Sequence, residues 1–478
     1  MAFSSLAFLL FFSCLFLLYW KVAKQRQWLL LLLASAYFYF SAVPAYGLLL
    51  SLVIGISYFT AISMEKQPQY KRIFLSLCLG FLFALLFVFK YFSFFSVSLV
   101  EVLAHFDLRI SLPHFKFLLP LGLSFFTFQT AGYLIDVYRG KIKAEKNLGI
   151  YALFVSFFPL ISSGPIERGD HLLPQLRKSQ RFNYARTVSG LQLFTLGLFK
   201  KVVIADNLAV VVNHIFGSLP DYRGLSLLIT IFLFSWQIYY DFSGYTDAAR
   251  GIARVLGYDL LDNFHHPYFA TSIGDFWRRW HISLSTWFRD YLYIPLGGNR
   301  KGLLRTCGNT LLVFVLCGLW HGASWNFVFW GLMHGLLLSF QRVFSFFMKQ
   351  VPVVPSFFSL PMTYLLVCAS WVFFRAETLA DALYIFRNSL QGIRFFGSPA
   401  YVWATLSQMF TTNVWEMGIV AVCLICALAI EVFSWQKNSA QRFARLPLLL
   451  RWSIYSTGIF LLFFLRQAQI TTFFYIQF

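Results

Sequence analysis

The sequence contains few charged residues. Only 12% of its 478 residues are Asp, Glu, Lys or Arg, whereas 59% are hydrophobic and 20% aromatic. Soluble domains contain roughly 45–50% apolar residues, so this composition excludes a water-soluble globule. The abundance of Phe, Leu and Trp also excludes an extensively disordered chain. The chain is therefore predicted to be an integral membrane protein.

Cysteine is scarce, and all seven cysteines lie within or at the edge of apolar stretches. A thiol in that setting acts as a small buried hydrophobe, so no disulfide framework is expected. The sequence also lacks H-E-x-x-H, Walker, G-x-G-x-x-G and D-x-D motifs. Metalloprotease, ATPase, dinucleotide-dependent and metal-dependent glycosyltransferase chemistries therefore lack their residues, and we expect no metal site.

Apolar runs follow one another along the chain and predict roughly eleven transmembrane helices plus shorter pieces, at about 20 residues per crossing. We place these runs at residues 3–20, 28–42, 46–63, 73–100, 117–135, 148–163, 188–212, 225–240, 306–341, 357–374, 414–434 and 446–465. The run at 148–163 is short and has basic residues on both sides, which favours a re-entrant or interfacial segment. No internal repeat or linker divides the chain, so residues 1–478 are predicted to form one domain.

The formal net charge is +20, from 39 Lys and Arg against 19 Asp and Glu. The basic residues cluster in short gaps between apolar runs, so orientation in a membrane explains them better than nucleic-acid binding. Basic residues follow the first run and none precedes it, which predicts a retained span with Met1 outside and the next gap in the cytoplasm.

The window from Thr306 to Gln341 contains no Asp, Glu, Lys or Arg. As one straight helix it would be roughly 54 Å long, against a hydrocarbon core of about 30 Å, so it must bend. Basic residues on both sides favour a hairpin that breaks at residues 322–324. His321 then lies at the break, roughly 18 Å from the cytoplasmic edge.

An ionisable side chain at that depth is a functional candidate by default, although a buried histidine can also simply hydrogen-bond a neighbouring helix. His334 lies in the same window and is the weaker candidate. The patterns G-L-W-H-G at His321 and G-L-M-H-G at His334 are both small-xxx-small helix contacts.

The stretch from Asp241 to Lys301 mixes Arg, Trp, Tyr and Phe at short spacing. One interpretation is an amphipathic collar at the lipid–water interface. The other is a cytoplasmic basic surface that receives an anionic substrate. His281 lies in this stretch beside Arg278 and Arg279, whereas His265 and His266 precede Pro267 and indicate a turn.

Several long motifs resemble the membrane-bound O-acyltransferase (MBOAT) family, in particular the bacterial branch that contains the alginate O-acetylation protein. They are PLGLSFFTFQTAGYLIDVYRG (120–140), SFFPLISSGPIER (156–168), GLFKKVVIADNLA (197–209), IYYDFSGYTD (238–247), DFWRRWHISLSTWFRDYLYIPLGGNR (275–300) and CGLWHGASWNFVFWGLMHG (317–335). The match is dense over residues 120–335.

The resemblance implies an all-α polytopic fold with about eleven transmembrane helices and re-entrant segments around a central tunnel. It also implies that His321 is the essential catalytic residue and His281 a second histidine of the site. The acyl group is expected to pass from a cytoplasmic thioester, most simply acetyl-CoA, to a serine-type acetyltransferase outside the bacterial inner membrane, which then modifies alginate or another polysaccharide.

The donor is thus expected to be a substrate, with no bound cofactor. Its phosphates could be attracted by the basic face, for which the candidates are Arg278, Arg279, Arg289, Arg300 and Lys301. Trp320, beside His321, is a further candidate for substrate contact. The alternatives are a transporter or flippase for a glycan or acyl carrier, for which matching half-repeats are missing, and a structural scaffold for polysaccharide export.

Overall fold

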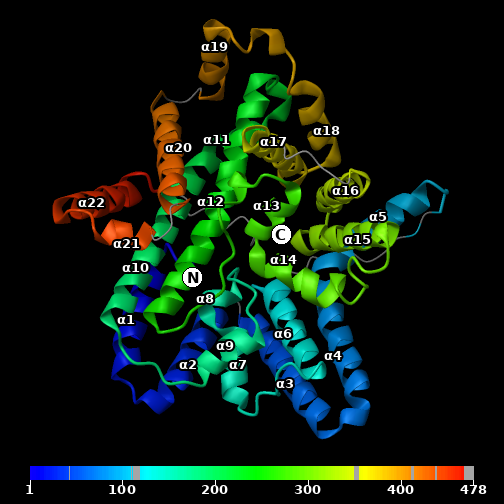
Figure 1. The fold of residues 1–478 in the computed structure, drawn as a ribbon, viewed down its shortest axis with the longest axis vertical. Helices are drawn as coiled ribbons and strands as arrows, with labels where there is room; N and C mark the ends of the chain where they lie inside the picture. Colours follow the sequence, from blue (N-terminus) through cyan, green and yellow to red (C-terminus); the bar gives the residue numbers. More distant parts are fainter. Residues whose placement is uncertain are drawn as a thin grey trace.

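The structure is a computed structural model that describes residues 1–41, 44–108, 110, 119–348, 355–410, 414–435 and 439–467. These residues form helices and connecting loops, and no strand occurs among them (Figure 1). The predicted all-α polytopic class is therefore confirmed.

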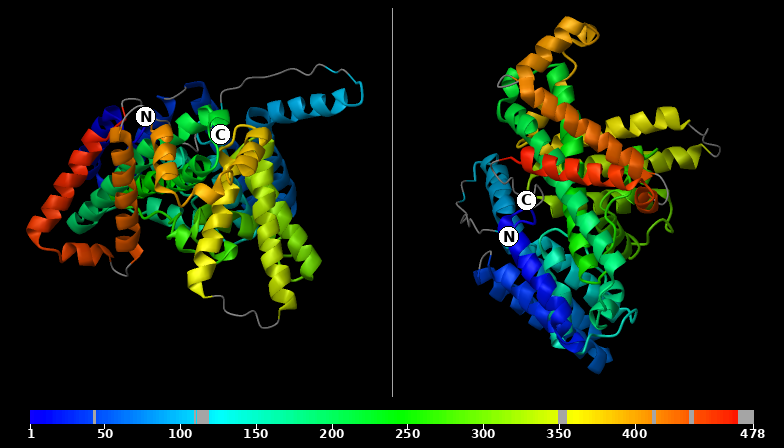
Figure 2. Two further views of the ribbon diagram at one scale, coloured as in Figure 1. Left: turned by 90° about the horizontal axis from the view of Figure 1, so that it is seen from above. Right: turned by 90° about the vertical axis from the view of Figure 1, so that its left-hand side faces the viewer.

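The first four N-terminal helices lie in the lower part of the view in Figure 1, and the fifth lies at its right-hand side. They are α1 (Leu6–Lys21), α2 (Gln27–Phe40), α3 (Pro44–Lys66), α4 (Lys71–Leu86) and α5 (Phe92–Ala104), with short turns η1 (Lys24–Arg26) and η2 (Pro68–Tyr70). A π-helical segment, η3 (Phe87–Tyr91), joins α4 to α5. Figure 2 shows α5 projecting away from the body of the protein.

The next helices form the centre of the fold. They are α6 (Leu123–Tyr138), α7 (Leu148–Ser156), α8 (Phe158–Ile161), α9 (Gly169–Leu176), α10 (Tyr184–Leu198), η4 (Phe199–Ala205), α11 (Asp206–Gly217), η5 (Leu219–Asp221) and α12 (Leu225–Val255). The long α12 is mostly buried and packs against α10, α11 and α17 (Ser356–Arg375). The apolar run at 148–163 is broken at Phe157 into two short buried helices.

The following helices carry the candidate site. They are η6 (Pro267–Phe269), α13 (Ile273–Arg279), α14 (Ile282–Phe288), η7 (Arg289–Tyr293), α15 (Leu303–His321) and α16 (Trp325–Phe347). The predicted hairpin is confirmed, because α15 and α16 pack against each other and the chain breaks at residues 322–324. At the crossing, a Cβ on Gly318 would overlap the Phe327 carbonyl oxygen, so only glycine allows the two backbones to lie so close.

The remaining helices are α18 (Leu379–Asn388), η8 (Ile393–Phe395), α19 (Pro399–Met409), α20 (Val414–Trp435), α21 (Ser439–Ala444) and α22 (Leu448–Phe464). The last three form an arm at the side of the molecule (Figure 2).

Glu431 of α20 joins this arm to the body: one of its oxygens lies 2.6 Å from His266 Nδ1, and the other accepts the Tyr239 hydroxyl at 2.9 Å. His266 lies just before η6, so the predicted turn at this point is confirmed.

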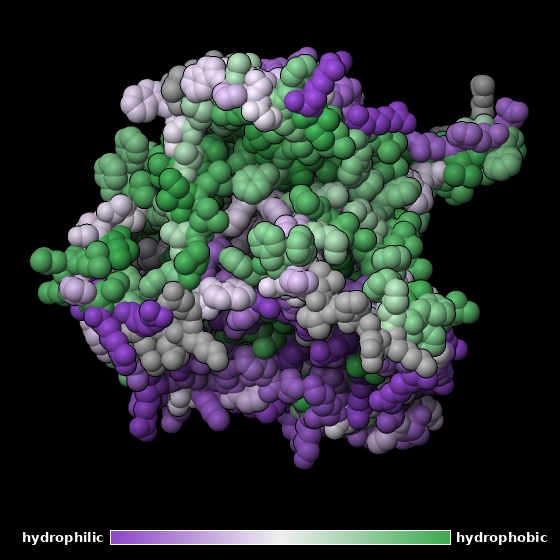
Figure 3. Space-filling model, turned by 45° about the horizontal axis from the view of Figure 1, so that its top comes forward, coloured by the Kyte–Doolittle hydropathy of each residue, from purple (hydrophilic) through white to green (hydrophobic). Residues whose placement is uncertain are grey.

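Seven helical segments of the described residues are long and apolar enough to cross a membrane, and three shorter apolar helices accompany them. The chain is therefore a multi-pass membrane protein, while the count of about eleven crossings stays a prediction. Figure 3 shows a broad band of hydrophobic side chains across the middle of the visible face, with hydrophilic ones gathered below it and others along the top edge.

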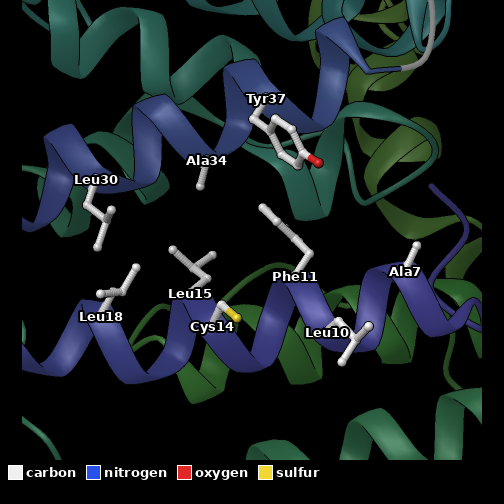
Figure 4. Close-up of a pocket in the computed structure, with 9 residues that line it drawn as sticks. All are labelled: Ala7, Leu10, Phe11, Cys14, Leu15, Leu18, Leu30, Ala34 and Tyr37. Carbon is white, nitrogen blue, oxygen red and sulfur yellow. The ribbon is translucent and has the colours of Figure 1, made fainter.

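An apolar groove of about 440 Å³ opens between α1 and α2 (Figure 4). It is lined by Ala7, Leu10, Phe11, Cys14, Leu15, Leu18, Leu30, Ala34 and Tyr37. Such a lining suits hydrocarbon chains, and the candidate chemistry lies elsewhere, at the end of α15.

Candidate active site

His321 is the last residue of α15 and lies directly before the break in the hairpin. It is only 4% exposed. Gly322 continues in an extended conformation and Ser324 precedes the first turn of α16, so the chain turns back immediately after the histidine. The sequence prediction that His321 lies at a helix break is thus confirmed.

His281 is fully buried in the short connection between α13 and α14. Its backbone is left-handed, with φ +42°, a conformation uncommon outside glycine although histidine adopts it more often than most residues. Asn263 holds this connection, because its backbone oxygen accepts the Ile282 amide and its side-chain oxygen accepts the Ser283 amide. The centre of the His281 ring is 6.3 Å from that of His321. The fold therefore brings together the two histidines singled out in the sequence.

Aromatic rings surround the two imidazoles. The Trp320 ring lies 5.0 Å from His321 and 5.7 Å from His281, both edge to face. Trp330 and Phe374 contact His321 at 4.9 Å and 5.2 Å between ring centres. Such contacts fix the plane of the imidazole and keep bulk water away from it.

His334, the weaker candidate, lies on α16, about one helical turn after Trp330. Its Nδ1 accepts the indole N–H of Trp277 at 3.3 Å, and its ring is stacked on Phe276. Trp330 stands between it and His321, 5.0 Å from His334. These contacts fit a packing role for His334.

The aromatic residues of the 241–301 stretch do not form an interfacial collar. Phe276 and Trp280 are fully buried, and Trp277 and Trp287 are less than a tenth exposed. They pack inward, against partners that include Trp371 of α17 and Phe128 of α6. The interpretation as a collar is wrong because these rings lie in the interior, where they pack around the histidines.

The predicted basic residues remain nearer the surface. Arg278 and Arg289 have side chains 71% and 59% exposed, and Arg300 and Lys301 are also exposed. Arg279 lies over the ring of Trp435 and bonds Asp275 at 3.0 Å. Burial opposes ionisation of Asp275, but the hydrogen bond and charge of Arg279, together with Arg278, lower the pKa of its carboxyl.

Lys90 was not among the residues predicted from the sequence, but it lies in η3 and contacts the end of α15. Its ammonium donates to the backbone oxygens of Trp320 at 2.6 Å and His321 at 3.1 Å. The available signal was a lone lysine inside the apolar run at 73–100, because an ionisable residue in a membrane span is costly and usually has a specific partner.

A second set of buried charges was also missed, where η4 faces α12. Lys200 lies 2.7 Å from Asp247, and Lys201 lies 2.8 Å from Asp206 and 2.5 Å from Asp241. The opposite charges lie in contact, which limits the cost of burying them and links η4 to α12.

Comparisons with known proteins identify the family to which the chain belongs. A family model described as MBOAT, the membrane-bound O-acyltransferase family, matches residues 145–376. The chain is 39% identical over 391 residues to a protein of Pseudomonas putida named probable alginate O-acetylase AlgI, covering 79% of this chain and 78% of that protein. It is 40% identical over 390 residues to the peptidoglycan O-acetyltransferase of Helicobacter pylori, covering 75% and 72%.

A more distant similarity is 29% identity over 275 residues to the teichoic acid D-alanyltransferase of Bacillus subtilis, covering 54% of this chain and 69% of that protein. The chain belongs to the membrane-bound O-acyltransferase family, in its alginate O-acetylation branch. It is an O-acyltransferase, and the resemblance found in its motifs is confirmed.

Proposed function

We propose that this protein takes an acetyl group from cytoplasmic acetyl-CoA and passes it through the bacterial inner membrane to an acceptor outside, for O-acetylation of a polysaccharide such as alginate. The observation that carries the proposal is the placement of His321. In a chain of this family, the imidazole lies buried at the break of a hairpin, with a second histidine ring 6.3 Å away.

The proposed binding of acetyl-CoA is supported by exposed positive charges that lie close in sequence to the buried His281. Arg278, whose side chain is mostly exposed, precedes the fully buried His281 by three positions. Arg289, Arg300 and Lys301 add exposed positive charge on the segments that follow. These residues would attract the phosphates of the donor and bring its thioester toward the histidines.

The chemistry follows from a neutral imidazole in a dry site. His321 takes the proton from an acceptor hydroxyl while the hydroxyl oxygen attacks the thioester carbonyl, a step in which general-base catalysis contributes on the order of 10²–10⁴-fold. The new C–O bond forms and the C–S bond breaks. The thiolate leaves readily because the pKa of the corresponding thiol is only about 8.5. The imidazolium then returns its proton to the thiolate or to solvent.

The rings of Trp320, Trp330 and Phe374 would protect this step from water. A thioester in a wet site is hydrolysed, whereas one enclosed by aromatic side chains reacts with the hydroxyl that is held beside it. We assign His281 to the same site because its ring faces both Trp320 and His321.

The acceptor side rests on the relatives, whose names refer to alginate, peptidoglycan and teichoic acid. All three are extracellular or cell-wall polymers with hydroxyl groups. We propose a serine-type acetyltransferase outside the membrane as the direct partner, with the final polysaccharide chosen by that partner.

The test uses a bacterium that makes an O-acetylated polysaccharide and lacks its own protein of this kind. The wild-type chain should restore polysaccharide acetylation, and His321→Ala should abolish it at equal membrane abundance. His105→Ala changes an exposed histidine outside the site and serves as the matched control. Acetylation by His321→Ala at the wild-type level would reject the proposal.

A further inference from the structure

The C-terminal end of α15 carries the reactive histidine, and its backbone oxygens need partners. The last four carbonyl oxygens of a helix accept no hydrogen bond from an amide of the same helix. A glycine after the helix often solves this by adopting a left-handed conformation. Gly322 is instead extended, with φ −162°, and its amide reaches only the Gly318 oxygen, at 3.3 Å.

The other three carbonyl groups are taken by side chains of η3. The Tyr91 hydroxyl donates to the Leu319 oxygen at 2.9 Å. The Lys90 ammonium donates to the Trp320 oxygen at 2.6 Å and to the His321 oxygen at 3.1 Å. Lys90 and Tyr91 thus supply hydrogen-bond donors to the last three carbonyl groups of α15.

The local geometry of η3 explains how neighbours in sequence reach the same helix end. Residues 87–91 form a π-helical turn, in which the backbone is wider than in an α-helix, and such turns occur frequently at functional sites. Lys90 also lies 3.4 Å from the Ser124 hydroxyl of α6, so α6 and α15 meet at its ammonium.

The charge of Lys90 also favours its position at the end of α15. A cation at the C-terminus of a helix interacts favourably with the partial negative charge of the unpaired carbonyl groups. Burying an ammonium group inside an apolar segment is costly, and such residues usually mark function. Here the ammonium contacts the backbone of the catalytic candidate itself, and it lies 6.0 Å from the centre of the Trp320 ring.

We propose that Lys90, assisted by Tyr91, is a positioning residue that holds the His321 end of α15 in its reactive orientation. This inference rests on the proposed function. Lys90 lies outside residues 145–376, which the family model matches. Loss of its ammonium would leave two carbonyl groups at the helix end without their donor, and the last turn of α15 would shift.

The experiment measures thioester turnover by purified protein, with labelled acetyl-CoA and the extracytoplasmic acceptor. Lys90→Met keeps the length of the side chain and removes its donors, and we expect kcat to fall by about 10- to 100-fold, since a displacement of 1 Å can cost that much. The KM for acetyl-CoA should change by less than about twofold, because the donor-binding surface is elsewhere. Lys90→Arg should recover most of the lost kcat.

Lys71→Met is the matched control, because Lys71 also donates to a backbone oxygen, that of Tyr138 at 3.5 Å, but lies exposed at the start of α4. It should retain wild-type kcat. If Lys90→Met fails to accumulate, Tyr91→Phe removes a single hydroxyl and should lower kcat several-fold at unchanged KM.

Wild-type kcat in Lys90→Met, or in Tyr91→Phe when the first variant does not accumulate, would overturn the positioning role. A loss that appears in KM rather than kcat would also overturn it. A wild-type protein that shows no thioester turnover would instead overturn the proposed function, so the two failures are distinguishable.

Discussion

Gly318→Ala should separate the arms of the α15–α16 hairpin and displace the end of α15 that carries His321. A Cβ at this position would overlap the Phe327 carbonyl oxygen and lie 3.0 Å from the Phe327 carbonyl carbon. Carbon atoms pack at about 3.5–4.0 Å, so the two helices must move apart by on the order of 1 Å. The helix backbones fix the positions of both the new Cβ and the Phe327 carbonyl group, so no side-chain rotation can relieve the overlap.

The displacement acts on His321, which follows Gly318 by less than one turn of the same helix. A misplacement of about 1 Å lowers the rate of a positioned reaction by up to roughly 100-fold. We therefore expect Gly318→Ala to lose about 10- to 100-fold in thioester turnover and to unfold at a lower temperature.

Gly308→Ala is the matched control on the same helix. Nothing lies within 4 Å of a Cβ at Gly308, so the substitution meets open space. It should keep wild-type activity and gain up to about 1 kcal/mol of stability from the better helix propensity of alanine. Wild-type turnover by Gly318→Ala, measured as CoA release by purified protein, would refute the reasoning.

Two further predictions concern stability. Glu431→Ala should destabilise the protein by about 1–3 kcal/mol, because it removes the acceptor of the buried Tyr239 hydroxyl and the partner of His266, whereas Glu431→Gln should cost less; equal losses in chemical unfolding would contradict this. The hydrogen bond from His171 to Glu167 raises the pKa of that histidine. The pair therefore stabilises the fold fully below the unfolded pKa of about 6.5 and loses this contribution as pH rises through the raised folded pKa. His171→Gln should accordingly cost at most about 1 kcal/mol at pH 6, because the pair is partly exposed, and less at higher pH; a loss that grows with pH would be inconsistent with the sign of the shift.

Sequence predicted the elements that depend on local composition. The hairpin break at residues 322–324 followed from a charge-free window too long for one crossing, and the structure has it there. The short run at 148–163, for which the sequence favours a re-entrant or interfacial segment, forms two short helices that meet at Phe157. The motifs identified the family, which the comparisons confirm.

Properties that depend on packing were harder to predict. The rings of the 241–301 stretch have the composition of an interfacial belt, and only the fold shows that Phe276 and Trp280 lie inside. Lys90 could not be assigned to α15, because its partners are backbone oxygens more than 200 positions away and a backbone acceptor leaves no trace in composition. A π-helical turn such as η3 has no comparable pattern in the sequence.

The most direct test of the central claim is the rate at which purified protein releases CoA from acetyl-CoA in the presence of its extracytoplasmic acceptor. Acyl transfer at His321 predicts acceptor-dependent release by the wild type and a loss of at least 100-fold in His321→Ala, with the His105→Ala control unchanged. Equal release by His321→Ala, or movement of labelled ligand across a membrane without release of CoA, would contradict it.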